Sequence, residues 1–160
     1  MGVFGFTEVF KASEPLPLPN AGTIRIPTIA GYAALKLAAW LDRSAYNKYK
    51  DASDIASVLH WYSELPEVYA LLYDTEEGMD ILVQEGADYS VAAARILGRD
   101  IAEILGSRTS ELTRAWPGPR EDSLYVEMTA TGAPIWPHSP KRRKELVQGM
   151  ERGLGLDSAG

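Results

Sequence analysis

Residues 28–41 decide the central part of this fold, and they read Thr28-Ile29-Ala30-Gly31-Tyr32-Ala33-Ala34-Leu35-Lys36-Leu37-Ala38-Ala39-Trp40-Leu41. Thr28 is a residue type that caps helix N-termini, and apolar residues recur after it at helical spacing. The segment therefore predicts a helix from Thr28 to about Asp42 that is apolar on most sides and central in the fold. Lys36 is the only charged residue within residues 28–41. A buried ammonium costs desolvation energy, so it needs a partner or a function.

The next segment offers acids to match these cations. After a polar linker, Ser44 to Tyr49, a second helix is expected to begin near Asp51. Its inward face is Ile55, Val58, Leu59 and Tyr62. In the first helix Lys36 and Arg43 are seven residues apart and so lie on nearly one face, where Tyr32 and Trp40 flank Lys36. One helix thus presents cations, and the other presents the carboxylates of Asp51 and Asp54.

Three interpretations of these charges remain open. Lys and Arg can neutralise triphosphate oxygens beside a carboxylate, which suits phosphoryl or nucleotidyl transfer. Asp51-x-x-Asp54 also has the spacing of a capping box, a helix-start motif without catalytic meaning. Lys36 could instead pair with one of the aspartates and simply join two helices.

The N-terminal region predicts a β hairpin. Glu14 to Pro19 alternates Pro with Leu, which suits an edge strand, and Thr23 to Ile26 alternates as a second strand should. Asn20-Ala21-Gly22 between them has turn chemistry. Val3 to Phe10 fits either a strand or a short helix, and the pattern does not decide between them.

Downstream of Pro66 the pattern stays helical as far as Trp116. Shorter helices are expected over Pro66 to Leu72 and Thr75 to Gln84. A longer one follows Asp88 and stops at Gly106, with Val91, Ala94, Ile101 and Leu105 as its buried stripe. Arg95 and Arg99 in it are expected to form a solvated ladder beside Asp100 and Glu103.

Trp116-Pro117-Gly118-Pro119 marks the clearest boundary, because two prolines and a glycine cannot continue a helix. Ser123 to Thr131 alternates weakly and predicts a strand, whereas Pro140 to Leu154 predicts an amphipathic helix. That helix begins with a basic cluster, residues 141–144. The cluster is either an RNA or phosphate contact or, as we favour, a solvated end that keeps a small helix soluble.

Composition narrows the function. The 160 residues are 46% hydrophobic and 24% charged, as expected of one globular domain with a real core. The net charge of −6 argues against a protein that coats nucleic acid. With no cysteine and only His60 and His138, thiolate and histidine metal sites are excluded. No apolar stretch approaches the roughly 20 residues of a membrane span, so no membrane partner and a cytoplasmic location are expected.

At these central residues the sequence resembles the AbiEii/AbiGii toxin family of nucleotidyltransferases. The resemblance rests on Ile-Pro-Thr-Ile-x-Gly-Tyr-Ala-Ala-Leu-Lys36-Leu-Ala-Ala-Trp-Leu-Asp-Arg43, followed by Lys50-Asp51-x-x-Asp54-Ile. The later Ala93-Ala94-Arg95-Ile96-Leu97-Gly98-Arg99-Asp100-Ile101 is similar to the helical half of these proteins. The resemblance as a whole covers about Gly5 to Leu105.

The resemblance implies an enzyme that moves a nucleotide from an NTP to an RNA or protein acceptor with Mg²⁺ or Mn²⁺, in toxin–antitoxin or phage-defence systems. It implies Lys36, Asp51 and Asp54 as catalytic residues, and Lys36, Arg43 and Lys50 as nucleotide-binding residues. Which aspartate leads is left open. The alternatives are that Arg43 is a helix C-terminal cation and Lys50 a surface residue.

The chain departs from the family pattern in one respect. Such enzymes carry Gly-Ser or Gly-Gly and then Asp-x-Asp on a strand, and this sequence has no Asp-x-Asp. Its one Gly-Ser, Gly106-Ser107, follows the long helix instead of preceding a strand. A start site placed too late, a broken gene, or a module that has lost catalysis would each explain this. Without clustered carboxylates to hold the metal, we expect the chain alone to be inactive.

The sequence therefore predicts a mostly helical α+β fold, a small N-terminal β hairpin followed by a helical bundle, equivalent to the C-terminal part of a nucleotidyltransferase. Residues 1–116 would form the partial domain, with a β portion over 1–27 and a helical portion over 28–116. Residues 117–160 would form a linker and tail. The partner would be an antitoxin or the missing N-terminal polypeptide. A noncatalytic helical interaction module is the alternative function.

Overall fold

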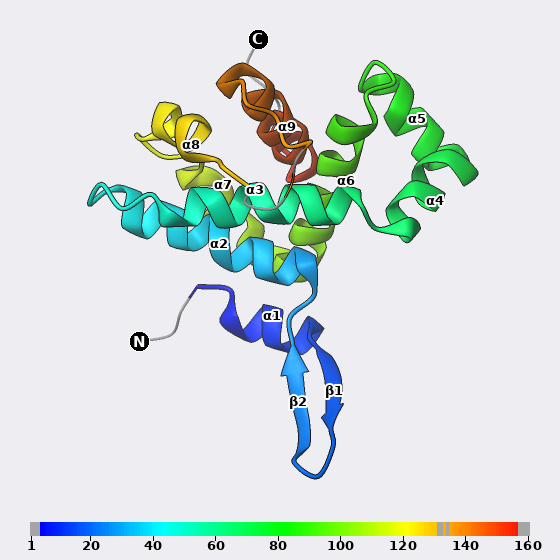
Figure 1. Ribbon diagram of the computed structural model, residues 1–160, viewed down its shortest axis with the longest axis vertical. Helices are drawn as coiled ribbons and strands as arrows, with labels where there is room; N and C mark the ends of the chain where they lie inside the picture. The colour runs from blue at the N-terminus through cyan, green and yellow to red at the C-terminus, as the bar shows by residue number, and fades with distance from the viewer. Residues whose placement is uncertain (1–3, 131–132, 134, 157–160) are drawn as a thin grey trace.

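A computed structural model describes residues 4–130, 133 and 135–156, and these residues are mostly helical with one small β hairpin near the N-terminus. The elements follow in the order α1 (Phe6–Ala12), β1 (Glu14–Leu18), β2 (Gly22–Ile26), α2 (Ile29–Ser44), α3 (Lys50–Ser63), α4 (Pro66–Asp74), α5 (Glu76–Gln84), α6 (Tyr89–Leu105), a 3₁₀ turn (Gly106–Arg108), α7 (Thr109–Ala115), α8 (Glu121–Glu127) and α9 (Pro140–Gly153). Figure 1 shows the hairpin projecting away from the helices. The predicted fold class is confirmed at this level.

The N-terminal segment settles the open choice in favour of a helix. Phe6–Ala12 forms α1, and Val9 is its buried residue. The side chain of Val9 packs so closely on α2 that a Cβ added to Gly31 would lie 3.0 Å from its Cγ1. Val3, where the expected segment began, lies outside the described residues. A short amphipathic turn of helix thus covers the start of α2.

The hairpin is confirmed, and its turn has a clear chemical cause. Asn20 has φ 59°, and the amide of Ala21 donates to the carbonyl of Leu18 at 3.3 Å. With Pro19 before Asn20, this is the pattern of a type II turn, which needs a left-handed residue at its third position. The strands pair antiparallel from Glu14 opposite Ile26 to Leu18 opposite Gly22.

Helices α2 and α3 form the predicted central pair. The Thr28 hydroxyl accepts a hydrogen bond from the amide of Gly31 at 3.0 Å, which confirms the expected cap. Helix α2 runs to Ser44, two residues beyond the expected end, and α3 begins at Lys50, one residue before the expected start. All four residues of the expected inward face of α3 are buried. The two helices pack against each other, and both pack against α6.

The following helices also begin where their caps predict. Pro66 opens α4, and the Thr75 hydroxyl caps α5 by accepting from the amide of Gly78 at 3.0 Å. Asp88 caps α6 by accepting from the amide of Val91 at 3.1 Å, and Gly106 follows its last residue. The expected buried stripe of α6 is confirmed. Among the described residues, no helix combines the length and the apolar character that crossing a membrane requires.

The predicted strand over Ser123 to Thr131 is wrong. Residues 121–127 form α8, and Leu124, Tyr125 and Met128 are buried. These positions are spaced three and four apart, which is the period of a helix and not of a strand. Thr131 lies outside the described residues. The alternation of Leu124, Val126 and Met128 misled because Val126 is 59% exposed and does not share their buried face.

The predicted amphipathic helix at the C-terminus is confirmed as α9, and it is deeply integrated. Its expected face, Leu146, Val147, Met150 and Leu154, is buried, and it packs along α6. Glycines allow the two backbones to meet: a Cβ on Gly98 would lie 2.0 Å from the carbonyl oxygen of Met150, and one on Gly153 would lie 2.0 Å from that of Arg95. The buried side chains of α9 therefore share one core with those of α2, α3 and α6.

The expectation that the basic cluster of α9 is solvated is wrong for its central arginine. Arg143 is only 7% exposed, and its guanidinium donates to the backbone carbonyls of Pro137, Tyr125 and Val126 at 2.8–3.0 Å. Arg142 is paired with Asp88 at 2.7 Å. Carbonyls without a hydrogen-bond donor are costly inside a protein, so Arg143 has a structural role. The basic residues beside it in the sequence gave no sign of this role.

The predicted ladder of Arg95 and Arg99 is also wrong for Arg95. Its guanidinium lies 2.9 Å from Glu85, whose side chain is 5% exposed and which Arg152 also contacts at 2.5 Å. Arg99 instead pairs with Glu77 at 2.7 Å and lies 3.9 Å from Asp100. Glu85 therefore joins α5 to both α6 and α9 through charge.

Candidate functional site

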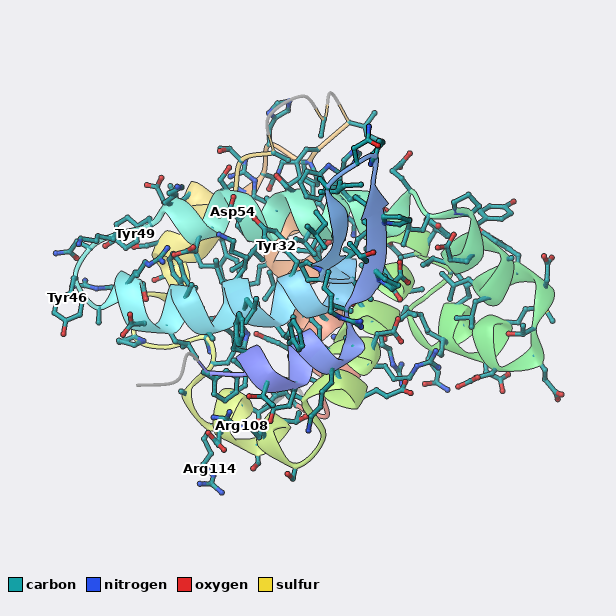
Figure 2. All side chains as sticks on the ribbon, turned by 90° about the horizontal axis from the view of Figure 1, so that it is seen from below. Tyr32, Tyr46, Tyr49, Asp54, Arg108 and Arg114 are labelled. Carbon is teal, nitrogen blue, oxygen red and sulfur yellow. The ribbon has the colours of Figure 1, made fainter. Side chains whose placement is uncertain are left out.

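The candidate site lies between the facing sides of α2 and α3. Lys36 projects from the middle of α2, and its amine lies 2.7 Å from Oδ2 of Asp54 and 3.6 Å from Oδ1 of Asp51. Its amine also stands 5.3 Å from the centre of the Tyr32 ring, one turn earlier on α2. Figure 2 shows Tyr32 and Asp54 on these two adjacent helices. The structure thus brings together the three residues that the sequence resemblance assigned to catalysis.

Asp51 forms the inner part of the site. Its side chain has 0% exposure, and Nη1 of Arg43 lies 3.1 and 3.2 Å from its two oxygens. Arg43 is at the last turn of α2 and is itself half exposed. Asp51 is therefore contacted by both cations on the shared face of α2, Lys36 and Arg43. We call these four residues, Lys36, Arg43, Asp51 and Asp54, the ion cluster.

The capping-box interpretation of the two aspartates is wrong. Tyr49 occupies the N-cap position of α3 and makes no side-chain capping hydrogen bond. Asp51 lies within the first turn of α3, and its carboxylate oxygens accept hydrogen bonds from the guanidinium of Arg43. Negative charge there also suits the helix N-terminus. The interpretation in which Lys36 ties two helices together matches the observed ion pairs.

Lys50 stands apart from the cluster. It is the first residue of α3 and is exposed, and no ion pair involves it within the described part of the chain. Its expected nucleotide-binding role thus has no support from a neighbouring charge. It matches the surface residue that the sequence offered as the alternative.

The charges of the ion cluster balance. Partial burial acts to lower the pKa of Lys36, but the hydrogen bond and charge of Asp54, with smaller contributions from Tyr32 and Asp51, outweigh it and raise that pKa. Lys36 is therefore a protonated donor at neutral pH and cannot act as a general base. Two cations facing two carboxylates leave no net positive charge. A triphosphate would have to compete with Asp54 for the Lys36 amine.

The carboxylates of the cluster do not fit the Mg²⁺ or Mn²⁺ that the resemblance implies. Hard divalent cations need several oxygen ligands, and Asp51 is already occupied by Arg43 and Lys36. Within residues 4–130, 133 and 135–156 there is no group of three acidic, histidine or cysteine side chains that could hold a metal ion. We derive no metal-dependent step from these residues.

Trp40, one turn after Lys36 on α2, makes a contact that the sequence did not reveal. Its side chain is fully buried, its ring lies 5.8 Å from that of Tyr49, and its Nε1 donates to the carbonyl of Pro117 at 3.0 Å. The flanking position of Trp40 was predictable from helical spacing. Its contact with Pro117 was not, because 77 residues separate them.

A groove at the base of the hairpin was also missed. It has a volume of about 870 Å³, and its lining includes the acidic residues Glu8, Glu14, Glu67, Asp100 and Glu103. Asp100 accepts a hydrogen bond from the hydroxyl of Tyr62 at 2.5 Å, and burial with this bond raises the pKa of Tyr62. These acids come from α1, β1, α4 and α6, so no local motif announces them.

Comparisons of this chain with family models, with curated proteins and with solved structures gave no match.

Proposed function

We propose that this chain is the C-terminal, helical part of an AbiEii-like nucleotidyltransferase, which depends on a second polypeptide for its metal-binding carboxylates. The observation that carries the proposal is the seat of Lys36, whose amine stands between Asp51 and Asp54 although these residues are 15 or more positions away in the sequence. The same three residues carry the sequence resemblance. The reaction would move a nucleotide from an NTP to an RNA or protein acceptor.

In this proposal Lys36 contacts the triphosphate. Its side chain is 21% exposed, so a phosphate oxygen could reach it from solvent. Phosphoryl and nucleotidyl transfer depend mainly on positioning and on neutralising charge, which a fixed ammonium provides. Asp54 would hold the amine in place until the nucleotide takes over one of its hydrogen bonds. Asp51 and Arg43 would hold the pair of Lys36 and Asp54 in position.

The second polypeptide would contribute the clustered carboxylates and, with them, Mg²⁺ or Mn²⁺. Metal-assisted transfer needs carboxylates that hold the ions against the attacking and leaving oxygens. The four charges of the ion cluster satisfy one another and leave no such ligands over. We therefore expect no transferase activity from the chain alone.

Label transfer from radioactive NTPs tests the proposal. The purified chain is compared with the chain co-expressed with a polypeptide that carries the Gly-Ser and Asp-x-Asp motif of such enzymes, each with Mg²⁺ or Mn²⁺ and candidate RNA and protein acceptors. We expect label transfer only from the pair, and we expect Lys36→Met to abolish it. Lys48→Met, which removes an exposed lysine just after α2, is the matched control and should leave transfer unchanged. Transfer by the chain alone that Lys36→Ala abolishes, or no transfer by the pair, would refute the proposal.

A second candidate is a noncatalytic interaction module that binds an antitoxin or another partner chain. The observation that favours it is the hairpin, whose strand residues are exposed except for Leu18, which is half-buried. A two-stranded hairpin is marginally stable by itself and leaves strand edges open. A strictly monomeric chain at micromolar concentration, with no binding of an apolar dye, would count against this candidate.

A further inference from the structure

The two edges of the hairpin differ, and the prolines of β1 cause the difference. In an antiparallel pair, opposite residues alternate between hydrogen-bonded and non-hydrogen-bonded positions. Pro15 faces Arg25 and Pro17 faces Thr23. Since proline has no N–H, these must be the non-hydrogen-bonded pairs. The outer edge of β1 therefore lacks donors at both prolines, and no further strand can pair fully with it.

The outer edge of β2 has the opposite character. The register that blocks β1 directs the N–H and C=O groups of Thr23 and Arg25 away from the hairpin, where each can pair with another strand. Every residue of β2 is exposed, and within the described residues the sheet has only these two strands. Figure 1 shows the hairpin standing clear of the helices. β2 is thus an open edge that can accept a strand.

The same register makes one face of the hairpin apolar. Ile24 lies opposite Leu16, and their neighbours on this face are Ile26, Leu18 and Gly22, with Glu14 at its end on β1, opposite Ile26. The side chains of Leu16, Ile24 and Ile26 are 41–45% exposed. The side chain of Arg25 is on the other face, where it donates to Ser13 and lies over the ring of Phe10. The charge nearest the open edge is therefore held away from the apolar face.

We propose that the open edge of β2 pairs with β2 of a second copy of this chain, antiparallel about a two-fold axis at Ile24. In this register Ile24 meets Ile24 of the second copy in a non-hydrogen-bonded pair, where side chains are closest. Thr23 faces Arg25 of the second copy in a hydrogen-bonded pair, and the two-fold axis repeats this pair. No like charges stand directly opposite each other.

The paired hairpins form a four-stranded sheet in the order β1, β2, β2, β1. The prolines of β1 then lie at both outer edges, so the sheet closes at two copies and cannot extend into a fibre. Leu16 and Ile24 of both copies form one continuous row on the apolar face. Strands of five residues bury far less than the roughly 1,200–2,000 Å² of stable complexes, so the dimer is weak and concentration-dependent.

Sedimentation of the full chain tests the proposal over about 10 μM to 1 mM, where weak associations are measurable. The mass of the wild type should rise towards twice the monomer mass. Thr23→Pro removes the outward N–H without touching the bonds to β1, and it should keep the chain monomeric across this range. Thr23→Ala keeps the N–H and is the matched control, which should dimerise like the wild type.

Hydrogen exchange of backbone amides in the wild type tests the proposed pairing of the β2 strands even if Thr23→Pro disturbs the hairpin. The amides of Thr23 and Arg25 should become protected as concentration rises, while the amide of Leu16, inside the hairpin, should be equally protected throughout. A monomer at all concentrations, a dimer that Thr23→Pro leaves intact together with the hairpin, or concentration-independent exchange at Thr23 and Arg25 would each overturn the proposal. These readouts do not involve nucleotide transfer, so the proposed function can fail or stand separately.

Discussion

At the residue scale, Asp51 governs the energetics of the ion cluster. Its carboxylate has no exposed surface and is compensated by Arg43 and Lys36. Lys36 and Asp54 are partly exposed, at 21% and 28%, so water shares their stabilisation. Removing a partner from a buried charge is costly, whereas removing a partly solvated charge is not. The four members of the cluster should therefore respond unequally to substitution.

Substitutions in the ion cluster should separate stability from function. We expect Lys36→Met to change the free energy of unfolding by less than about 1 kcal/mol. In this variant Asp51 still has Arg43 as a partner, and the partly exposed Asp54 is still solvated by water. Asp51→Ala should cost about 1–3 kcal/mol, because it removes the buried acceptor of two cations. Urea denaturation measures both values. A Lys36→Met variant that is several kcal/mol less stable would mean that Lys36 is chiefly a structural tie.

Glu85 should make stability depend on acid. Burial acts to raise the pKa of Glu85, but hydrogen bonds and charge from Arg152 and Arg95 outweigh it and hold the pKa below its ordinary value of 4.5. The unfolded chain therefore binds the proton more readily, and the contribution of Glu85 is present above pH 4.5 and lost as pH falls through the lower, folded-state pKa. Glu85→Gln should destabilise the chain at pH 7, and the difference from wild type should shrink below pH 4.5.

Urea midpoints between pH 3 and 7 measure this effect, with the exposed Glu76→Gln as the control. A difference between wild type and Glu85→Gln that stays constant across this pH range would contradict the assignment to Glu85.

At the scale of elements, α9 is held by polar contacts at its first turn as well as by its apolar face. Arg143 satisfies carbonyls at the end of α8 and in the segment before α9, and Arg142 reaches the cap residue of α6, Asp88. The cap and the ion pair share one carboxylate, and the hydrogen bond from Arg142 is the main cause of the lowered pKa of Asp88. The first turn of α9 thus connects three elements.

Substitutions at the start of α9 should show whether Arg143 has a structural role. Arg143→Met should cost about 2–4 kcal/mol of unfolding free energy, because three backbone carbonyls lose their charged donor and the one of Tyr125 is buried. Lys141→Met removes an equal charge from the exposed neighbour and should cost less than about 0.5 kcal/mol. Thermal or urea unfolding compares the two. Equal, small effects would show that the carbonyls find other donors.

At the scale of the whole molecule, residues far apart in the chain build one core. Helix α6 packs on α2, α3 and α9, so the segment after Trp116 covers a surface that the earlier helices leave apolar. Side chains from α9 such as Val147 and Met150 are almost completely buried in it. Folding should therefore be cooperative over the helices on both sides of Trp116-Pro117.

Truncation after Trp116 tests this cooperativity. We expect the shortened chain to lose its sharp thermal transition and to bind an apolar dye, because α6 would expose the face that α9 covers. Calorimetry of the full chain should show one transition. A truncated chain with a transition as sharp as that of the full chain would show that residues 28–116 form an independent unit.

Sequence periodicity was sufficient for most of the helices and for the hairpin, because caps such as Thr28 and prolines such as Pro66 act locally. It failed at α8, where seven residues are too few to reveal their period. It also left the role of the ion cluster open: spacing placed Lys36 and Arg43 on one face, but only the packing of α2 on α3 placed Asp51 against them. Arg143 looked like a surface charge because its acceptors are remote in sequence.

The crossing of α6 and α9 also has a consequence for the history of this chain. At Gly98 and Gly153 the facing backbone occupies the place that any side chain would need. Drift at these two positions should be arrested, whereas exposed positions of the same two helices should vary. In an alignment of orthologues, paired glycines at this separation would mark proteins that kept the same docking of their last helix, even where the Lys36 segment had diverged beyond detection.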